Sequence, residues 1–120
     1  MVFGGASIHE LSLAEGIIEL LENQAKTQHF SRVKQVWLTI GELAGVEVDA
    51  LTFCLDVVSK NTLADGAVFH LLREPGRGWC MACSQEVSLG VRFDACPHCG
   101  KYQVQVTGGD EMRVSELEVE

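Results

Sequence analysis

The first regular pattern in the chain is an apolar stripe with helical spacing. Its members recur at intervals of three and four residues, while Glu15, Glu19 and Glu22 fall towards the opposite side. The stripe consists of Leu11, Ala14, Ile17, Ile18, Leu21 and Ala25. Two capping-box patterns, Ser7-x-x-Glu10 and Ser12-x-x-Glu15, stand at its beginning. The pattern predicts an amphipathic helix from about residue 12 to residue 28, with residues 1–7 as a loose arm.

A strand, a helix and a second strand follow in the pattern. Residues 33–40 are β-branched and aromatic with alternating apolar positions, which predicts a buried or half-buried strand. A glycine-containing break at residues 41–45 leads into a second helix, with Leu51 and Leu55 on its apolar side. Residues 67–73 form the next predicted strand. This order favours a right-handed crossover between two parallel strands.

The cysteine pattern is the strongest chemical signal in the chain. Cys80 and Cys83 form one CxxC pair, Cys96 and Cys99 form a second, and twelve residues separate the pairs. A tight reversal inside each pair directs both sulfurs to one point, so two facing pairs offer four thiolates in a tetrahedron that suits Zn²⁺. The alternatives are two disulfides or four unrelated core thiols. A closed Cys₄ zinc site performs no reaction, so the function is expected elsewhere.

The cysteine segment interrupts the pattern of strands and helices. Residues 74–78 contain a proline and two glycines, and residues 107–110 form a return linker. Residues 112–120 are strand-like and need a sheet to join. We therefore predict an α+β fold, in which residues 1–74 with 110–120 form a small mixed three-stranded sheet with two helices. Residues 75–109 form an inserted Cys₄ zinc-ribbon-like module.

Charge and composition exclude several classes of function. The 17 acidic residues outnumber the 9 basic residues, for a net charge of −8, which opposes nucleic-acid binding. The sequence lacks the roughly 18 consecutive apolar residues of a membrane span. Residues 1–7 lack the basic and apolar regions of a signal peptide, so we expect a cytoplasmic protein.

Outside the cysteine pairs, candidate reactive residues are few. His9 and Glu10 stand just before the first predicted helix, where an imidazole, a carboxylate and nearby backbone amides could chelate Ni²⁺ or Cu²⁺. A cap or surface role is the ordinary interpretation of such a pair. Cys54 lies among apolar residues and is expected to fill the core. The sequence contains neither a nucleophile–base arrangement nor a phosphate-binding loop, so we do not expect an enzyme.

Several collinear motifs together resemble one family, the HypA/HybF nickel chaperones of hydrogenase maturation. The motifs are HELSL (9–13), VWLTIGELAGVE (36–47), FCLDVVSKNTLADGA (53–67), WCMAC (79–83), CPHCG (96–100), TGGDEMRV (107–114) and ELEVE (116–120). The resemblance covers nearly everything from His9 onward.

The resemblance implies a nickel-binding module and a zinc module. It implies delivery of Ni²⁺ to the large subunit of [NiFe]-hydrogenase, together with a HypB-type nickel GTPase, and some members also serve urease. Apart from the resemblance, we also expect a homodimer. The nickel ligands of the family centre on a His-Glu pair that corresponds to His9 and Glu10, and in some members on a carboxylate that corresponds to Glu47.

The sequence departs from the family at this His-Glu pair. The family histidine normally follows the initiator methionine, whereas here seven residues precede Ile8, so the amine of Met1 is not adjacent to His9. We expect weaker nickel binding, or a different geometry, when residues 1–8 are present. The second functional hypothesis is a zinc-ribbon adaptor that binds a protein or nucleic acid and carries no second metal.

Overall fold

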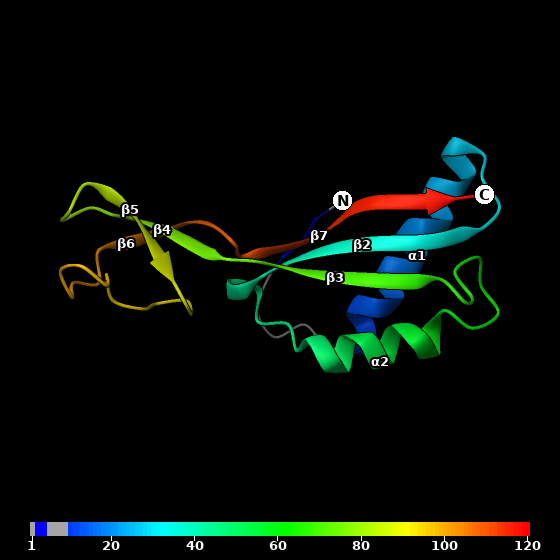
Figure 1. Cartoon of the computed structure of the whole chain (residues 1–120), viewed down its shortest axis with the longest axis horizontal. Coiled ribbons are helices and arrows are strands. Elements are labelled where there is room, and N and C mark those ends of the chain that lie inside the picture. The colour runs from blue at the N-terminus through cyan, green and yellow to red at the C-terminus, as the bar shows by residue number, and fades with distance from the viewer. Residues whose placement is uncertain (1, 5–9) are drawn as a thin grey trace.

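The structure, a computed structural model, describes residues 2–4 and 10–120. The molecule is elongated, measuring 51 × 25 × 17 Å, with one β-sheet towards each end (Figure 1). The two helices lie with the larger sheet (Figure 1). In chain order the elements are β1 (Val2–Gly4), α1 (Glu10–Gln28), β2 (Val33–Gly41), the 3₁₀ helix η1 (Glu42–Ala44), α2 (Val48–Val58), β3 (Val68–Glu74), β4 (Gly76–Cys80), β5 (Gln85–Leu89), β6 (Val104–Gly108) and β7 (Glu111–Val119).

The larger sheet has the order β1-β7-β2-β3. β2 and β3 are parallel, with Trp37 opposite His70, which confirms the predicted crossover. β7 pairs antiparallel with β2, so the C-terminal strand does return to the sheet that precedes the cysteine segment. The predicted mixed sheet with two helices is thereby confirmed.

The N-terminal prediction was wrong in one respect. Residues 2–4 are not a loose arm but form β1, which pairs antiparallel with β7 and places Phe3 opposite Met112. The larger sheet therefore has four strands where three were predicted. β1 covers the side of β7 that faces away from β2, where the backbone N–H and C=O groups would otherwise lack strand partners.

The main core lies between the helices and the larger sheet. Alternate residues of β2, among them Val36, Leu38 and Ile40, are fully buried and pack with residues from α1, α2 and β7. Those partners include Ile17, Leu21, Leu51, Leu55 and Met112. The buried face of α1 is rotated from the predicted stripe, because Leu11 is 45% exposed whereas Leu13 and Leu20 are buried.

The smaller sheet has the order β5-β4-β6, with both neighbours antiparallel to β4. Its core is a small cluster that contains Cys80, Cys96, Val87 and Leu89. Leu43 completes this cluster, although it belongs to η1 in the segment between β2 and α2. One residue from that segment is thus built into the core of the smaller sheet.

The two sheets meet where three chain segments are in close backbone contact. A Cβ atom on Gly41 would lie 2.2 Å from the carbonyl oxygen of Gly109, and one on Gly109 would lie 2.3 Å from that of Pro75. Gly109 also has a φ of +74°, which favours glycine. Only Pro75 separates β3 from β4, so the predicted break at residues 74–78 is narrower than expected.

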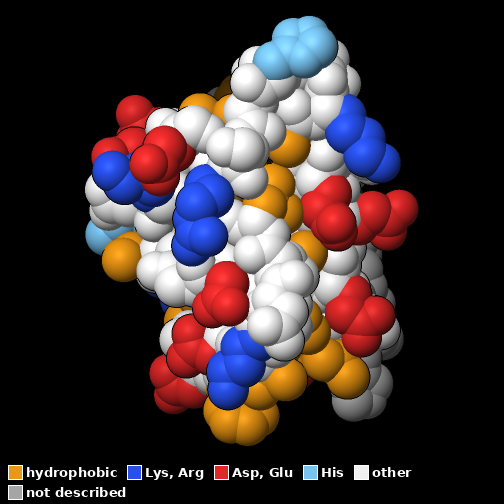
Figure 2. All heavy atoms as spheres, turned by 90° about the vertical axis from the view of Figure 1, so that its right-hand side faces the viewer, with side chains coloured by type: hydrophobic (Ala, Val, Ile, Leu, Met, Phe, Trp, Pro, Cys, Tyr) orange, Lys and Arg blue, Asp and Glu red, His pale blue; other side chains and the backbone are white. Residues whose placement is uncertain are grey.

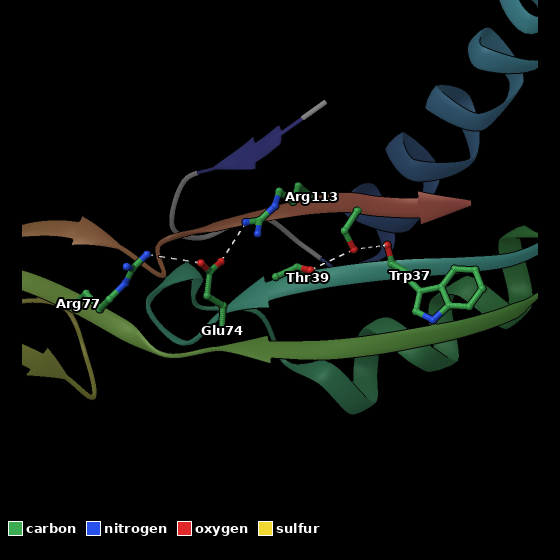
Figure 3. A network of polar contacts seen from close by, with 6 residues as sticks. Trp37, Thr39, Glu74, Arg77 and Arg113 are labelled. Carbon is green, nitrogen blue, oxygen red and sulfur yellow. Dashed lines mark hydrogen bonds and ion pairs between the residues drawn. The ribbon is translucent and has the colours of Figure 1, made fainter. Parts of the chain in front are cut away.

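Glu74 connects the strands at this junction (Figure 3). Its carboxylate lies 2.9 Å from the guanidinium of Arg113 on β7 and 3.7 Å from that of Arg77 on β4. Nearby, Thr39 donates to the hydroxyl of Ser115, which donates to the carbonyl oxygen of Trp37. Partly exposed ion pairs stabilise a fold by at most about 1 kcal/mol, so their main effect here is on strand position. The division into residues 1–74 with 110–120 and residues 75–109 stays a prediction.

The surface agrees with the acidic but mixed composition. At the end of the molecule away from the smaller sheet, acidic and basic side chains are interspersed (Figure 2). Within residues 2–4 and 10–120, the structure contains no helix that is long and apolar enough to cross a membrane.

Candidate metal centre

The four cysteines of the two CxxC pairs converge at one end of the smaller sheet. Cys80 ends β4 and Cys83 lies in the turn that follows, while Cys96 and Cys99 lie in the turn that leads to β6. Their sulfur atoms all lie within 4.8 Å of one another. The Cys80–Cys99 sulfurs are 3.7 Å apart and the Cys83–Cys96 sulfurs 3.9 Å. Each of the five cysteines carries a free thiol, so neither pair forms a disulfide.

These distances fit a tetrahedral metal site. Four sulfurs at about 2.3 Å from one zinc ion stand about 3.8 Å apart at the corners of a tetrahedron. A disulfide requires about 2.0 Å between its sulfurs. Two of the sulfur separations, 3.7 and 3.9 Å, match this spacing, and all four sulfurs lie within 4.8 Å of one another.

The two turns share two features. In each, a backbone amide donates to the first sulfur of the pair: Cys83 N–H to the sulfur of Cys80, and His98 N–H to that of Cys96, both at 3.4 Å. The residue after each pair has a positive φ, 52° at Ser84 and 75° at Gly100. This conformation turns the chain away from the sulfurs, and glycine adopts it without strain whereas serine does not.

Hydrogen bonding and burial shift the pKa values of Cys83 and Cys96 in opposite directions. A hydrogen bond with Cys99, together with burial and the sulfurs of Cys80 and Cys96, raises the pKa of Cys83 to about 12. Burial raises the pKa of Cys96, but hydrogen bonds from the backbone amides of Cys99 and His98 outweigh it and lower that pKa to about 6. A cation that binds the cluster would displace the proton of Cys83, because thiolates and not thiols are metal ligands.

Burial also differs around the cluster. Cys80 and Cys96 are buried, Cys83 is half-buried and Cys99 is exposed. The buried sulfurs face the small core of the smaller sheet, and Cys99 lies on the solvent side. Four thiol donors satisfy a tetrahedral ion completely, which is the donor set of a structural site.

Sequence reasoning missed two residues that support this centre. Leu43 is 4% exposed and packs in the same cluster as Cys80 and Cys96. The side chain of Arg92 donates to the carbonyl oxygen of Leu43 at 3.2 Å and lies 3.6 Å from the carboxylate of Asp110. The periodicity offered no signal for Leu43, because it stands alone in a glycine-bounded break.

The predicted nickel ligands are His9, Glu10 and Glu47, and the structure describes only the last two of them. His9 lies outside the described residues. Glu10 is the first residue of α1, and Glu47 precedes α2 without a side-chain capping hydrogen bond. Over the described ranges 2–4 and 10–120, the only group of three or more histidine, cysteine or acidic side chains with converging donor atoms is the four-cysteine cluster. The nickel ligand set stays a prediction.

The remaining histidines have other surroundings. His70 stacks on Trp37, with ring centroids 4.8 Å apart, and its Nε2 lies 2.7 Å from the side-chain oxygen of Gln35. His29 follows α1 at a φ of 60°, and His98 is exposed between the second pair of cysteines.

Comparisons with known proteins agree with this architecture. A family model described as hydrogenase/urease nickel incorporation, metallochaperone, HypA, matches residues 8–119. The hydrogenase maturation factor HypA of Azotobacter chroococcum mcd 1 is 56% identical over 113 residues, which cover 94% of this chain and 100% of that protein. The protein of the same name from Azotobacter vinelandii is 52% identical over the same shares.

A solved structure supports the fold. The solution structure of the Ni metallochaperone HypA from Helicobacter pylori superposes with a TM-score of 0.70 at 24% identity, covering 93% of this chain and 97% of that chain. The family model and the close relatives both span nearly the whole chain. The chain therefore belongs to the HypA family of nickel metallochaperones for hydrogenase maturation.

Proposed function

We propose that this protein binds Ni²⁺ and delivers it to the large subunit of [NiFe]-hydrogenase. The observation that carries the proposal is the family match over residues 8–119, with relatives named hydrogenase maturation factors at more than half identity. Nickel is the cargo in this proposal, and it is bound and released without chemical change. We also infer that the protein acts in the cytoplasm and is not an enzyme.

Zinc is the proposed occupant of the four-cysteine cluster. Cys80, Cys83, Cys96 and Cys99 would hold it, and the sulfur separations of 3.7 and 3.9 Å support that assignment. The ion would cross-link the two turns of a sheet whose own hydrophobic core is small. Its proposed role is therefore structural and, through the junction between the sheets, regulatory.

Nickel is proposed to bind at His9, Glu10 and Glu47. Imidazole, carboxylate and backbone nitrogen donors suit Ni²⁺, whereas the four thiolates suit zinc. A few ligands near the beginning of a helix release a metal more readily than a closed cage of four. That difference supports one retained ion and one transferable ion on the same chain.

The proposed partners are a HypB-type nickel GTPase and the hydrogenase large subunit, and a homodimer is a further prediction. Membership of a hydrogenase maturation family supports contacts with the maturation machinery. The net charge of −8 supports protein or metal-ion partners over nucleic acid.

A histidine substitution tests the nickel site. We expect His9→Ala to abolish labile Ni²⁺ binding in calorimetric titration while the zinc content and melting temperature stay unchanged. His29→Asn is the matched control, because this exposed histidine has a φ of 60° that asparagine tolerates. Full nickel binding by His9→Ala would show that the site is wrong. Zinc retention without any nickel binding by the unsubstituted chain would favour the zinc-ribbon adaptor.

A further inference from the structure

The smaller sheet carries a groove that neither proposed metal site uses. A cavity of about 480 Å³ lies between β6 and the loop that follows β5. Leu89, Val104 and Val106 line it, and Leu89 and Val104 approach each other over Gly78. A Cβ atom on Gly78 would lie 2.6 Å from Val104 and 2.8 Å from Leu89, so only glycine leaves room for this apolar floor. We call this cavity the β6 groove.

Two aromatic side chains stand at the groove without being buried. Phe93 is 88% exposed and Tyr102 is 75% exposed, and both line the cavity. Phe93 also has a φ of 65°, an uncommon and strained conformation for a bulky residue. The exposed ring gains little packing that could offset this strain. Exposed aromatic residues beside an apolar cavity are typical of a protein-binding surface.

The strand that forms one wall of the groove has a free edge. The sheet order is β5-β4-β6, so within the described part of the chain β6 pairs with β4 alone. The outer N–H and C=O groups of an edge strand are ready to pair with another extended segment. The free edge of β6 therefore favours a ligand that is an extended peptide segment, which can pair with it as a further strand.

The charged side chains that line the groove decide which ligand charge it attracts. Asp94 and Asp110 both line the cavity. Arg92 also lines it, but its guanidinium lies 3.6 Å from the carboxylate of Asp110 and donates to the carbonyl oxygen of Leu43. The guanidinium of Arg92 is therefore already paired within the protein. The groove presents a net negative charge, on a chain whose net charge is −8. Basic segments are attracted, and acidic segments or phosphates are repelled.

We propose that the β6 groove binds an extended segment of a partner protein whose groove-facing side chains, at every second position, include both apolar residues and lysine or arginine. The segment adds to the free edge of β6, directs its apolar side chains to the partly buried Val104 and Val106, and places its cations near Asp94. Phe93 and Tyr102, which both line the cavity, contact the bound segment. The inference does not depend on which cargo the protein carries.

Synthetic peptides test the polarity and the position of this site. Three fluorescent sets of ten-residue peptides would be titrated into the zinc-loaded full chain. The first set carries apolar and basic residues together at every second position, the second carries apolar and acidic residues together at every second position, and the third carries basic residues without apolar ones. We expect saturable anisotropy changes from the first set only. Amide chemical-shift changes should concentrate in β6 and in residues 91–94, and not in α2 or β3.

Substitutions then distinguish binding from folding. Phe93→Gly removes the exposed ring and relieves the positive φ, so the melting temperature should stay equal or rise while peptide binding weakens at least about tenfold. Tyr102→Ala should weaken binding similarly. Phe53→Ala is the matched control, because Phe53 is 69% exposed on α2 and should leave binding unchanged.

Four outcomes would overturn the proposal. They are equal binding of the apolar-acidic set, binding by none of the sets, chemical-shift changes centred on another surface, and wild-type affinity in Phe93→Gly. Sedimentation of the unsubstituted chain adds a fifth: self-association that Phe93→Gly abolishes would identify a second copy as the occupant.

Discussion

Leu43 provides the sharpest test of how the smaller sheet is held together. It belongs to η1, between β2 and α2, yet it is 4% exposed and packs with Cys80, Cys96, Val87 and Leu89. The Leu43→Ala substitution removes one of the few large apolar side chains from that cluster. The four cysteines themselves are unchanged, so any effect on zinc passes through packing.

The expected magnitude follows from burial. Truncating a buried leucine to alanine costs about 2–5 kcal/mol, and a small cluster near the surface that can partly collapse lies at the lower end, about 2–3 kcal/mol. Zinc binding is coupled to folding in small metal-held segments, so this loss should appear in the zinc affinity. At 1.4 kcal/mol for each tenfold change, the zinc Kd should rise about 30- to 150-fold. Competition with a chromophoric chelator measures that Kd directly.

A second buried leucine is the control. Leu51 on α2 is fully buried in the core of the larger sheet, and Leu51→Ala should lower the melting temperature but leave the zinc Kd within about threefold. An unchanged zinc Kd in Leu43→Ala would refute the structural role of Leu43. An equal rise in both variants would show that the two cores unfold as one unit.

Backbone conformation gives two further predictions. Ser84→Gly should raise the stability of the zinc-loaded protein by about 0.5–1 kcal/mol in thermal melts, because the strain of about 1–2 kcal/mol at a φ of 52° exceeds the added chain entropy of glycine; a lower melting temperature would contradict this. Gly109→Ala should destabilise by about 2–5 kcal/mol in urea titration, since it adds both left-handed strain and a Cβ 2.3 Å from a carbonyl oxygen. Gly45→Ala, at nearly the same φ but with no atom within 4 Å of the new Cβ, should cost only about 1–2 kcal/mol, and equal losses at both positions would disprove the close contact.

Much of the larger sheet could be predicted because its signals are local. The alternation of Val36, Leu38 and Ile40 marks the buried face of β2, and the order strand, helix, strand fixes the parallel pairing with β3. β1 was missed because three residues are too short for a periodic signal. The rotation of α1 was missed because Leu11, Leu13 and Leu20 are equally apolar, and only tertiary packing decides which of them is buried.

In the candidate metal site, too, local features could be predicted from the sequence and long-range contacts could not. Cysteine spacing alone predicted that the four sulfurs meet, since each CxxC turn is fixed by neighbouring residues. The contributions of Leu43 and Arg92 depend on contacts across about 50 residues of chain. The expected nickel ligand His9 lies outside the described residues, so its prediction rests on motif resemblance.

Metal analysis of the full chain tests the central claim most directly. The protein would be loaded with equimolar Zn²⁺ and Ni²⁺, dialysed against a mild chelator and analysed for both metals before and after dialysis. The account predicts one zinc and one nickel per chain before dialysis, and one zinc with little nickel afterwards. Loss of both metals together, or failure to take up nickel beside zinc, would contradict a chaperone that retains one ion and transfers the other.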